Sequence, residues 1–175
     1  MFERSMLENI IVAMDTGSGK THVALLRIRA ELERSPCTKS LIVWFLAPHV
    51  ELCNQQYREL CKGLPATKIK LLVGSDNVHR WSEQSIWDAA LDHVRLVIST
   101  HKILEDALAH NFVKLETLSL LVFDEEAHHC VRKHPANAIM QRFYHPRRMK
   151  LGFDSVPHIL GLTASPIQSK LKQLK

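Results

Sequence analysis

Residues 14–21 read Met-Asp-Thr-Gly-Ser-Gly-Lys-Thr, an order of residue types that suits phosphate binding. They follow the pattern G-x-x-x-x-G-K-[ST], with Met14 at the position of the first glycine. Two glycines in this stretch let the backbone curl so that successive N–H groups face a phosphate. Lys20 would reach the β- and γ-phosphates, and the Thr21 hydroxyl would ligate Mg²⁺. We therefore predict a nucleotide site at Met14, Asp15, Thr16, Gly17, Ser18, Gly19, Lys20 and Thr21.

A nucleotide site of this kind needs a carboxylate at the end of a neighbouring strand. Asp124 directly follows the apolar run 118–123, and Glu125 stands beside it. We predict that Asp124 holds Mg²⁺, through water, and that Glu125 is the base that activates the attacking water.

The elements that must position these residues alternate along the chain. An apolar, β-branched run precedes the glycine-rich loop, and apolar residues at helical spacing follow it. Continuous apolar runs of this kind are typical of strands that are buried on both faces. We predict strands over 9–13, 41–46, 69–73, 93–98, 118–123 and 158–162, and further helices over 50–61, 82–90, 100–108 and 135–144. Residues 146–157 are basic and rich in turn formers, which predicts a surface loop.

Strands that alternate with helices indicate an α/β fold, with a mostly parallel sheet and helices on both faces. Ligands of such folds bind beyond the carboxyl ends of the strands. Four chemically distinctive stretches fall at predicted strand ends: residues 14–21, 47–49, 124–125 and 163–165. The fold therefore gathers them at one edge of the sheet.

The composition fits one intracellular domain. The chain has 175 residues, of which 46% are hydrophobic and 23% charged, as in ordinary globular domains. Its formal net charge of +5 is compatible with a polyanionic partner. The four cysteines form no C-x-x-C pair, which favours free thiols in a reducing compartment. No signal peptide or membrane span is evident, so we expect the cytoplasm or the nucleus.

These stretches together resemble motifs I, Ia, II and III of superfamily-two helicases. The wording of residues 47–56 (APHVELCNQQ) and 161–166 (GLTASP) is most similar to Dicer-like proteins of the fungal type. The resemblance covers the whole chain and implies the N-terminal, RecA-like lobe of a P-loop NTPase. It further implies ATP and Mg²⁺ as ligands, double-stranded RNA as a partner, and a place in RNA silencing and antiviral defence.

The resemblance also implies roles for individual residues. Asp124, Glu125 and His128 would serve catalysis, and Thr163, Ala164 and Ser165 would couple hydrolysis to nucleic acid. Phosphate contacts favour hydroxyls, backbone N–H groups and helix N-termini. The expected nucleic-acid contacts are Pro48, His49, Gly74, Ser75, Ser99, Thr100 and His101.

The acidic motif departs from the family pattern Asp-Glu-Ala-His, because the chain reads Asp124-Glu125-Glu126-Ala127-His128. In one register Asp124 and Glu125 keep their roles and His128 is displaced by one residue. In the other register the run from Glu125 to His128 takes the motif positions, and a longer Glu replaces the metal-side Asp. We favour the first register, because the preceding strand fixes Asp124.

Residues 1–175 would form one lobe of a two-lobed helicase. The adenine-reading glutamine, the second lobe with its arginine finger, and ribonuclease III domains are not among them. We therefore expect nucleotide binding with little turnover from this chain. Two alternatives stay open: a non-catalytic nucleic-acid-binding or regulatory fragment, and a lobe of a DNA-repair helicase of the same superfamily.

Overall fold

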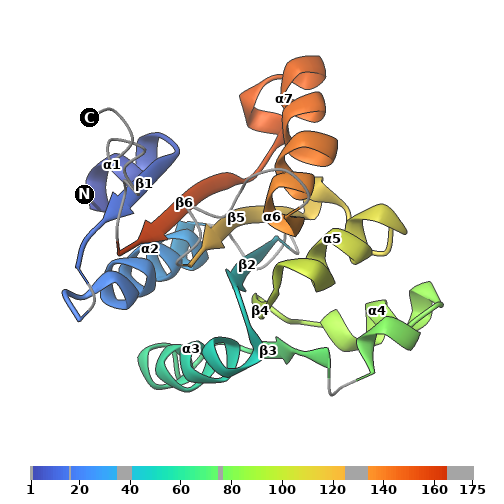
Figure 1. Cartoon of the computed structure of the whole chain (residues 1–175), viewed down its shortest axis with the longest axis horizontal. Coiled ribbons are helices and arrows are strands. Elements are labelled where there is room, and N and C mark those ends of the chain that lie inside the picture. Colours follow the sequence, from blue (N-terminus) through green and yellow to red (C-terminus); the bar gives the residue numbers. More distant parts are fainter. Residues whose placement is uncertain (1, 16, 35–40, 75–76, 125–133, 165–175) are drawn as a thin grey trace, which may run out of the picture.

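The computed structural model describes residues 2–15, 17–34, 41–74, 77–124 and 134–164. Six strands form one sheet in the order β1-β6-β5-β2-β4-β3, and every pairing between neighbours is parallel (Figure 1). The strands are β1 (Ile10–Ala13), β2 (Ile42–Ala47), β3 (Ile69–Leu72), β4 (Leu96–Thr100), β5 (Leu118–Phe123) and β6 (His158–Thr163). The predicted parallel α/β fold is confirmed.

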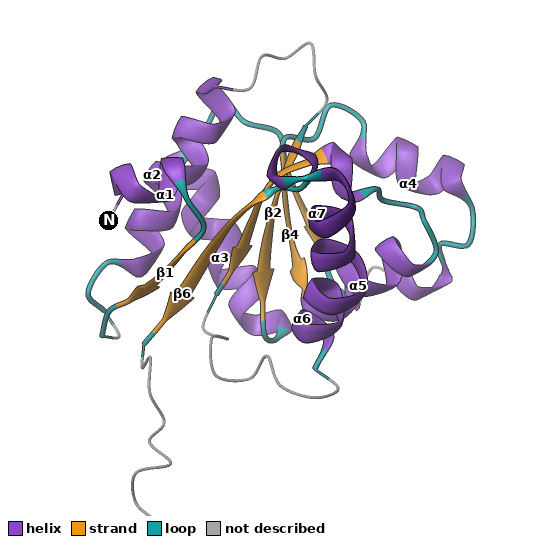
Figure 2. Ribbon diagram, turned by 90° about the horizontal axis from the view of Figure 1, so that it is seen from above, coloured by secondary structure: helices purple, strands orange, loops and turns teal. Residues whose placement is uncertain are grey.

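Helices cover both faces of this sheet (Figure 2). On one face, α2 (Lys20–Arg34) and α3 (Val50–Gly63) pack against strand side chains such as Val43 and Phe45. On the other face, side chains such as Trp44 and Leu46 pack against α4 (Gln84–Leu91), α5 (His101–Ala109), α6 (Pro135–Ala138) and the π-helix η4 (Ile139–Tyr144). Because every residue of β2 is buried, this strand needs the continuous apolar run that its sequence shows.

Shorter elements complete the described structure. They are α1 (Phe2–Leu7), α7 (His145–Leu151) and three 3₁₀ turns, η2 (Val78–Arg80), η3 (Leu115–Thr117) and η5 (Phe153–Ser155). Among the described residues, no helix is both long and apolar enough to cross a membrane.

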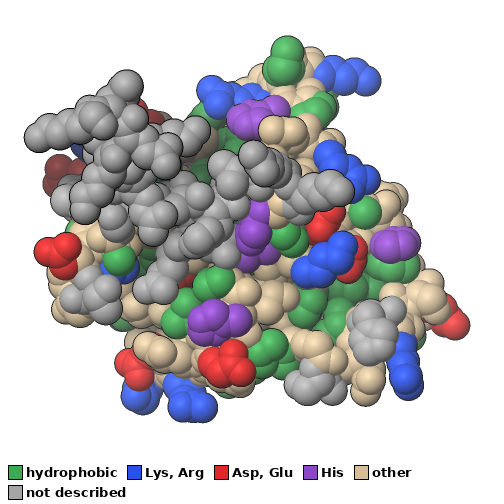
Figure 3. Space-filling model, viewed as in Figure 1, with side chains coloured by type: hydrophobic (Ala, Val, Ile, Leu, Met, Phe, Trp, Pro, Cys, Tyr) green, Lys and Arg blue, Asp and Glu red, His purple; other side chains and the backbone are tan. Residues whose placement is uncertain are grey.

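The prediction of a loop over 146–157 was wrong, because α7 and η5 occupy most of this stretch. Pro146 lies in the first turn of α7, where a missing N–H costs no helical hydrogen bond. The helix ends at Gly152, whose φ of +88° suits glycine. The surface position is correct, since no residue of α7 is buried, and basic side chains lie around this helix at the top of Figure 3.

Predicted boundaries also shift, and the largest shift is at the start of β4. β4 begins at Leu96 rather than at residue 93, because His93 has a left-handed φ of +55° and belongs to the preceding turn. The strand then extends through Ser99, whose hydroxyl accepts a hydrogen bond from the Trp44 indole at 2.8 Å. Helix α4 has Glu83 as its N-cap, one residue after the predicted Ser82.

Candidate nucleotide site

The glycine-rich loop joins β1 to α2 at the carboxyl edge of the sheet (Figure 1). Gly17 and Gly19 have φ values of +81° and +96°, a region that side chains other than glycine rarely adopt. Met14 does not have a positive φ, so the loop requires no glycine at that position. Thr16 lies outside the described residues.

Lys20 is the first residue of α2, and its side chain folds back over the loop. Its ammonium donates to the backbone carbonyls of Met14 at 2.9 Å and Asp15 at 3.2 Å, and only 8% of the residue is exposed. The Ser18 hydroxyl also donates to the Asp15 carbonyl. The Lys20 ammonium thus lies against a glycine-rich turn. A cation and backbone N–H groups of this kind both favour the binding of phosphate.

Asp124 follows β5 directly, as predicted, and is 3% exposed. Its backbone N–H donates to the Leu46 carbonyl at the end of β2, at 2.9 Å. The carboxylate accepts a hydrogen bond from the Gln56 amide at 2.9 Å, and the same amide nitrogen lies 3.4 Å from the Thr21 hydroxyl oxygen. Residues that are distant in sequence therefore converge on one point.

Gln56, which is not among the predicted site residues, is 4% exposed and contacts both Thr21 and Asp124. One signal was present. Gln56 lies three residues after Cys53 and four before Leu60, so it shares the buried face of α3 with them. A polar residue on such a face requires a hydrogen-bond partner.

The predicted stretch 163–165 contacts the glycine-rich loop through a backbone hydrogen bond. The Met14 N–H donates to the carbonyl of Thr163, the last residue of β6, at 3.0 Å. Strand β6 lies between β1 and β5, so it separates the glycine-rich loop from Asp124. Thr163 is buried and Ala164 half-buried.

Some predicted residues lie outside the described ranges. These are Glu125 and His128 of the acidic motif, Ser165 of the coupling stretch and Ser75 of the nucleic-acid stretch. Their roles, and the register of the acidic motif, stay predictions.

The remaining nucleic-acid candidates follow β2, β3 and β4 at the same edge of the sheet. His49 and Gly74 are exposed, and Pro48 and Thr100 are half-buried. His49 is the N-cap of α3, where its Nδ1 accepts from the Leu52 N–H at 3.2 Å. Ser99 and His101 are buried, which leaves no exposed side-chain surface for phosphate.

His101 is 2% exposed and packs between two aromatic rings. Its ring centroid lies 5.9 Å from that of Phe123 and 5.4 Å from that of His134. Burial, and then the charge of His134, lower the pKa of His101 from its usual 6.5 to about 3. The imidazole is therefore neutral at physiological pH, so it packs against Phe123 and His134 and supplies no cation.

This pKa predicts acid sensitivity of the fold. Between pH 6.5 and about 3 the unfolded chain binds more protons at His101 than the folded chain, so stability falls as the pH falls. The free energy of unfolding should lose up to about 1.4 kcal/mol per pH unit in that window. Urea unfolding at pH 7, 6 and 5 should show a shallower slope for His101→Gln than for the wild type.

His93→Asn is the matched control, because His93 is exposed and its left-handed φ also suits Asn. Its pH slope should equal that of the wild type. Equal slopes for all three proteins would contradict the account of His101.

Comparisons with known proteins show the family to which this chain belongs. The family profile described as DEAD/DEAH box helicase matches residues 3–174. Dicer-like protein 2 of Aspergillus terreus is 60% identical over 167 residues, and that of Coccidioides immitis is 58% identical over 166. Each alignment covers 95% of this chain, which spans 12% and 11% of those relatives' lengths respectively.

A solved structure shares the fold. The crystal structure of the Pyrococcus furiosus Hef helicase domain aligns with a TM-score of 0.75 and 27% identity, and the match covers 98% of this chain and 33% of that one. Because the family profile covers nearly the whole chain, the chain belongs to the DEAD/DEAH box helicase family.

Proposed function

We propose that this chain is the ATP-binding lobe of a nucleic-acid-dependent ATPase that acts on double-stranded RNA. Family membership gives it a nucleotide site and a nucleic-acid partner. The choice of RNA rests on similarity to proteins named Dicer-like protein 2, and we extend it to RNA silencing and antiviral defence.

One observation carries this proposal: Thr21 and Asp124 lie within reach of a single Gln56 amide nitrogen. Both present oxygen ligands, which Mg²⁺ prefers. Lys20, adjacent to Thr21, lies over the loop that would receive the phosphates. The residues present therefore fit a magnesium–nucleotide complex.

Each of these residues has a distinct part in the proposed reaction. Lys20 would leave the Met14 and Asp15 carbonyls for phosphate oxygens, and Thr21 and Asp124 would hold Mg²⁺. Bound Mg²⁺ neutralises charge that develops on the β- and γ-phosphates. Glu125 would accept the proton of the attacking water, and His128 would connect this site to residues 163–165.

The contact between Met14 and Thr163 supports coupling to nucleic acid. A shift of the glycine-rich loop on ATP binding would move the end of β6 through this backbone hydrogen bond. We propose that Thr163, Ala164 and Ser165 pass that shift to the nucleic-acid contacts. The exposed candidates among these contacts are His49 and Gly74, with Pro48 and Thr100 half-buried beside them.

Turnover by the 175-residue chain alone should be slow. The resemblance to superfamily-two helicases implies a facing lobe that contributes an arginine finger, and an arginine finger is worth roughly 10³–10⁵ in rate. We propose that this chain binds ATP by itself. It would hydrolyse ATP rapidly only when a second lobe that carries the arginine faces it.

A titration of double-stranded RNA with and without ATP and Mg²⁺ tests the proposed function. We expect the RNA affinity to change at least threefold with ATP and to decrease with salt, because phosphate contacts release counterions. Asp124→Asn should abolish the effect of ATP, whereas Asp106→Asn, at a half-buried acid of α5 that pairs with Lys102, should retain it. RNA binding that ignores ATP in the wild type would instead favour a non-catalytic RNA-binding fragment.

A further inference from the structure

Gln56 lies between two residues of the candidate nucleotide site, Thr21 and Asp124. It lies in the middle of α3, 35 residues from Thr21 and 68 from Asp124 in sequence, and contacts both. Its contact with Asp124 is the closer, at 2.9 Å against 3.4 Å for Thr21.

The chemistry of these partners fixes which end of the amide faces them. An ionised carboxylate only accepts hydrogen bonds, so Gln56 must present its NH₂ group to Asp124. The same group carries a second hydrogen, which is available for the Thr21 hydroxyl oxygen. The amide therefore brings positive partial charge to the place where two oxygen ligands converge.

The opposite end of the amide supports a functional role. Gln56 Oε1 is buried, and no partner is recorded for it among the described residues. A buried acceptor without a partner destabilises the fold, and a side chain selected for packing alone would avoid that cost. An acceptor beside a metal site can receive a hydrogen bond from metal-bound water.

We propose that Gln56 is a positioning residue that holds Thr21 and Asp124 at the spacing required for Mg²⁺ while the site is empty. With magnesium and nucleotide bound, the Gln56 NH₂ group would release Thr21 and keep Asp124, and Oε1 would be free to accept a hydrogen bond from a water that Mg²⁺ holds. This inference rests on the proposed function, because it assigns a residue to the same site. It adds a residue outside the glycine-rich loop and the acidic motif.

The test compares binding of a fluorescent ATP analogue in EDTA and in Mg²⁺. Gln56→Met keeps the length of the side chain and removes both its donor and its acceptor. Binding in EDTA should stay within about twofold of the wild type, because Lys20 and the loop are intact. The gain in affinity on adding Mg²⁺ should fall about tenfold or more, as expected when a hydrogen bond to a charged group is lost.

Gln55→Met is the matched control, because Gln55 is the neighbouring glutamine and is exposed. It should keep the full gain from Mg²⁺. Gln56→Glu supplies a second variant. Its carboxylate would repel Asp124 in EDTA and lower the melting temperature, and it would shift the half-saturating Mg²⁺ to a lower concentration by adding an oxygen ligand.

The outcomes are distinct. A full gain from Mg²⁺ in Gln56→Met would overturn the inference and leave the proposed function standing. An equal loss of affinity in EDTA and in Mg²⁺, with a lowered melting temperature, would assign Gln56 to packing and also overturn it. A wild type that binds no analogue in either buffer would refute the proposed function itself.

Discussion

Lys20→Ala should lower the affinity for a fluorescent ATP analogue by at least about 100-fold. The Lys20 ammonium already lies over the loop, held by the carbonyls of Met14 and Asp15. It can exchange these neutral acceptors for charged phosphate oxygens without large movement. Each charge-assisted hydrogen bond is worth about 1.5–3 kcal/mol, so the loss of two accounts for a factor of this size.

Fluorescence anisotropy in the presence of Mg²⁺ measures this effect. Lys102→Ala is the matched control, because Lys102 is an exposed lysine of α5 that pairs with Glu105 and Asp106. Its affinity should match that of the wild type, and thermal unfolding should confirm that both variants are folded. Undiminished binding by Lys20→Ala would remove the nucleotide site from residues 14–21.

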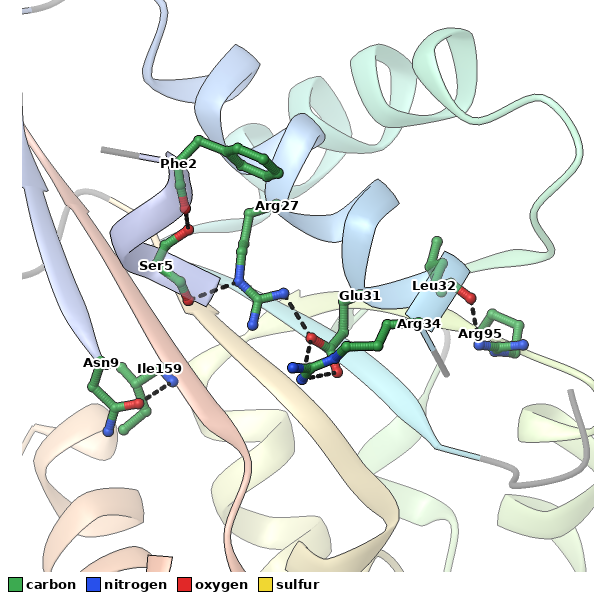
Figure 4. A network of polar contacts seen from close by, with 9 residues as sticks. All are labelled: Phe2, Ser5, Asn9, Arg27, Glu31, Leu32, Arg34, Arg95 and Ile159. Carbon is green, nitrogen blue, oxygen red and sulfur yellow. Dashed lines mark hydrogen bonds and ion pairs between the residues drawn. The ribbon is translucent and has the colours of Figure 1, made fainter. Parts of the chain in front are cut away.

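Glu31→Ala should lower the free energy of unfolding by about 3–5 kcal/mol, because it leaves a buried cation without its carboxylate partner. Arg27 is fully buried in α2, and its guanidinium donates to Glu31 at 2.6 Å and to the Ser5 carbonyl of α1 at 3.0 Å (Figure 4). Its Nη2 has no recorded partner among the described residues. Glu31 is therefore the only described carboxylate in contact with this charge.

Replacing Arg27 should lower the free energy of unfolding by less than replacing Glu31 does. Arg27→Met leaves Glu31 with Arg34, which lies 3.2 Å away and reaches solvent. The double variant Arg27→Met/Glu31→Leu should be more stable than Glu31→Ala, because apolar replacement of a buried ion pair is often neutral. Urea unfolding of the three proteins at pH 7 measures this order.

Glu8→Ala provides the control for Glu31→Ala. Arg4 and Glu8 form an ion pair at the same four-residue spacing, but both side chains are exposed. Exposed pairs contribute about 0–1 kcal/mol, so this variant should stay close to the wild type. If Glu31→Ala lowers the free energy of unfolding by no more than Glu8→Ala does, burial does not increase the contribution of the Arg27–Glu31 ion pair to stability.

The sequence alone determined the six strands and the residue types at their carboxyl ends. Mainly apolar runs identified all six strands. The reason is clearest in β2, where every residue is buried and both faces must therefore be apolar. Gly17, Gly19 and Lys20 identified the glycine-rich loop between β1 and α2, because its backbone requirements act on neighbouring residues. Asp124 was placed correctly at the end of β5 for the same local reason.

Packing between distant segments decided the rest. The strand order places β6 between β1 and β5, and no local pattern encodes which parallel strands become neighbours. That order brings Gln56 to Thr21 and Asp124, and the packing of α5 against α6 buries His101 against His134. Local residue patterns fix what each segment is, whereas contacts across tens of residues fix which side chains meet, and these exist only once the sheet has formed.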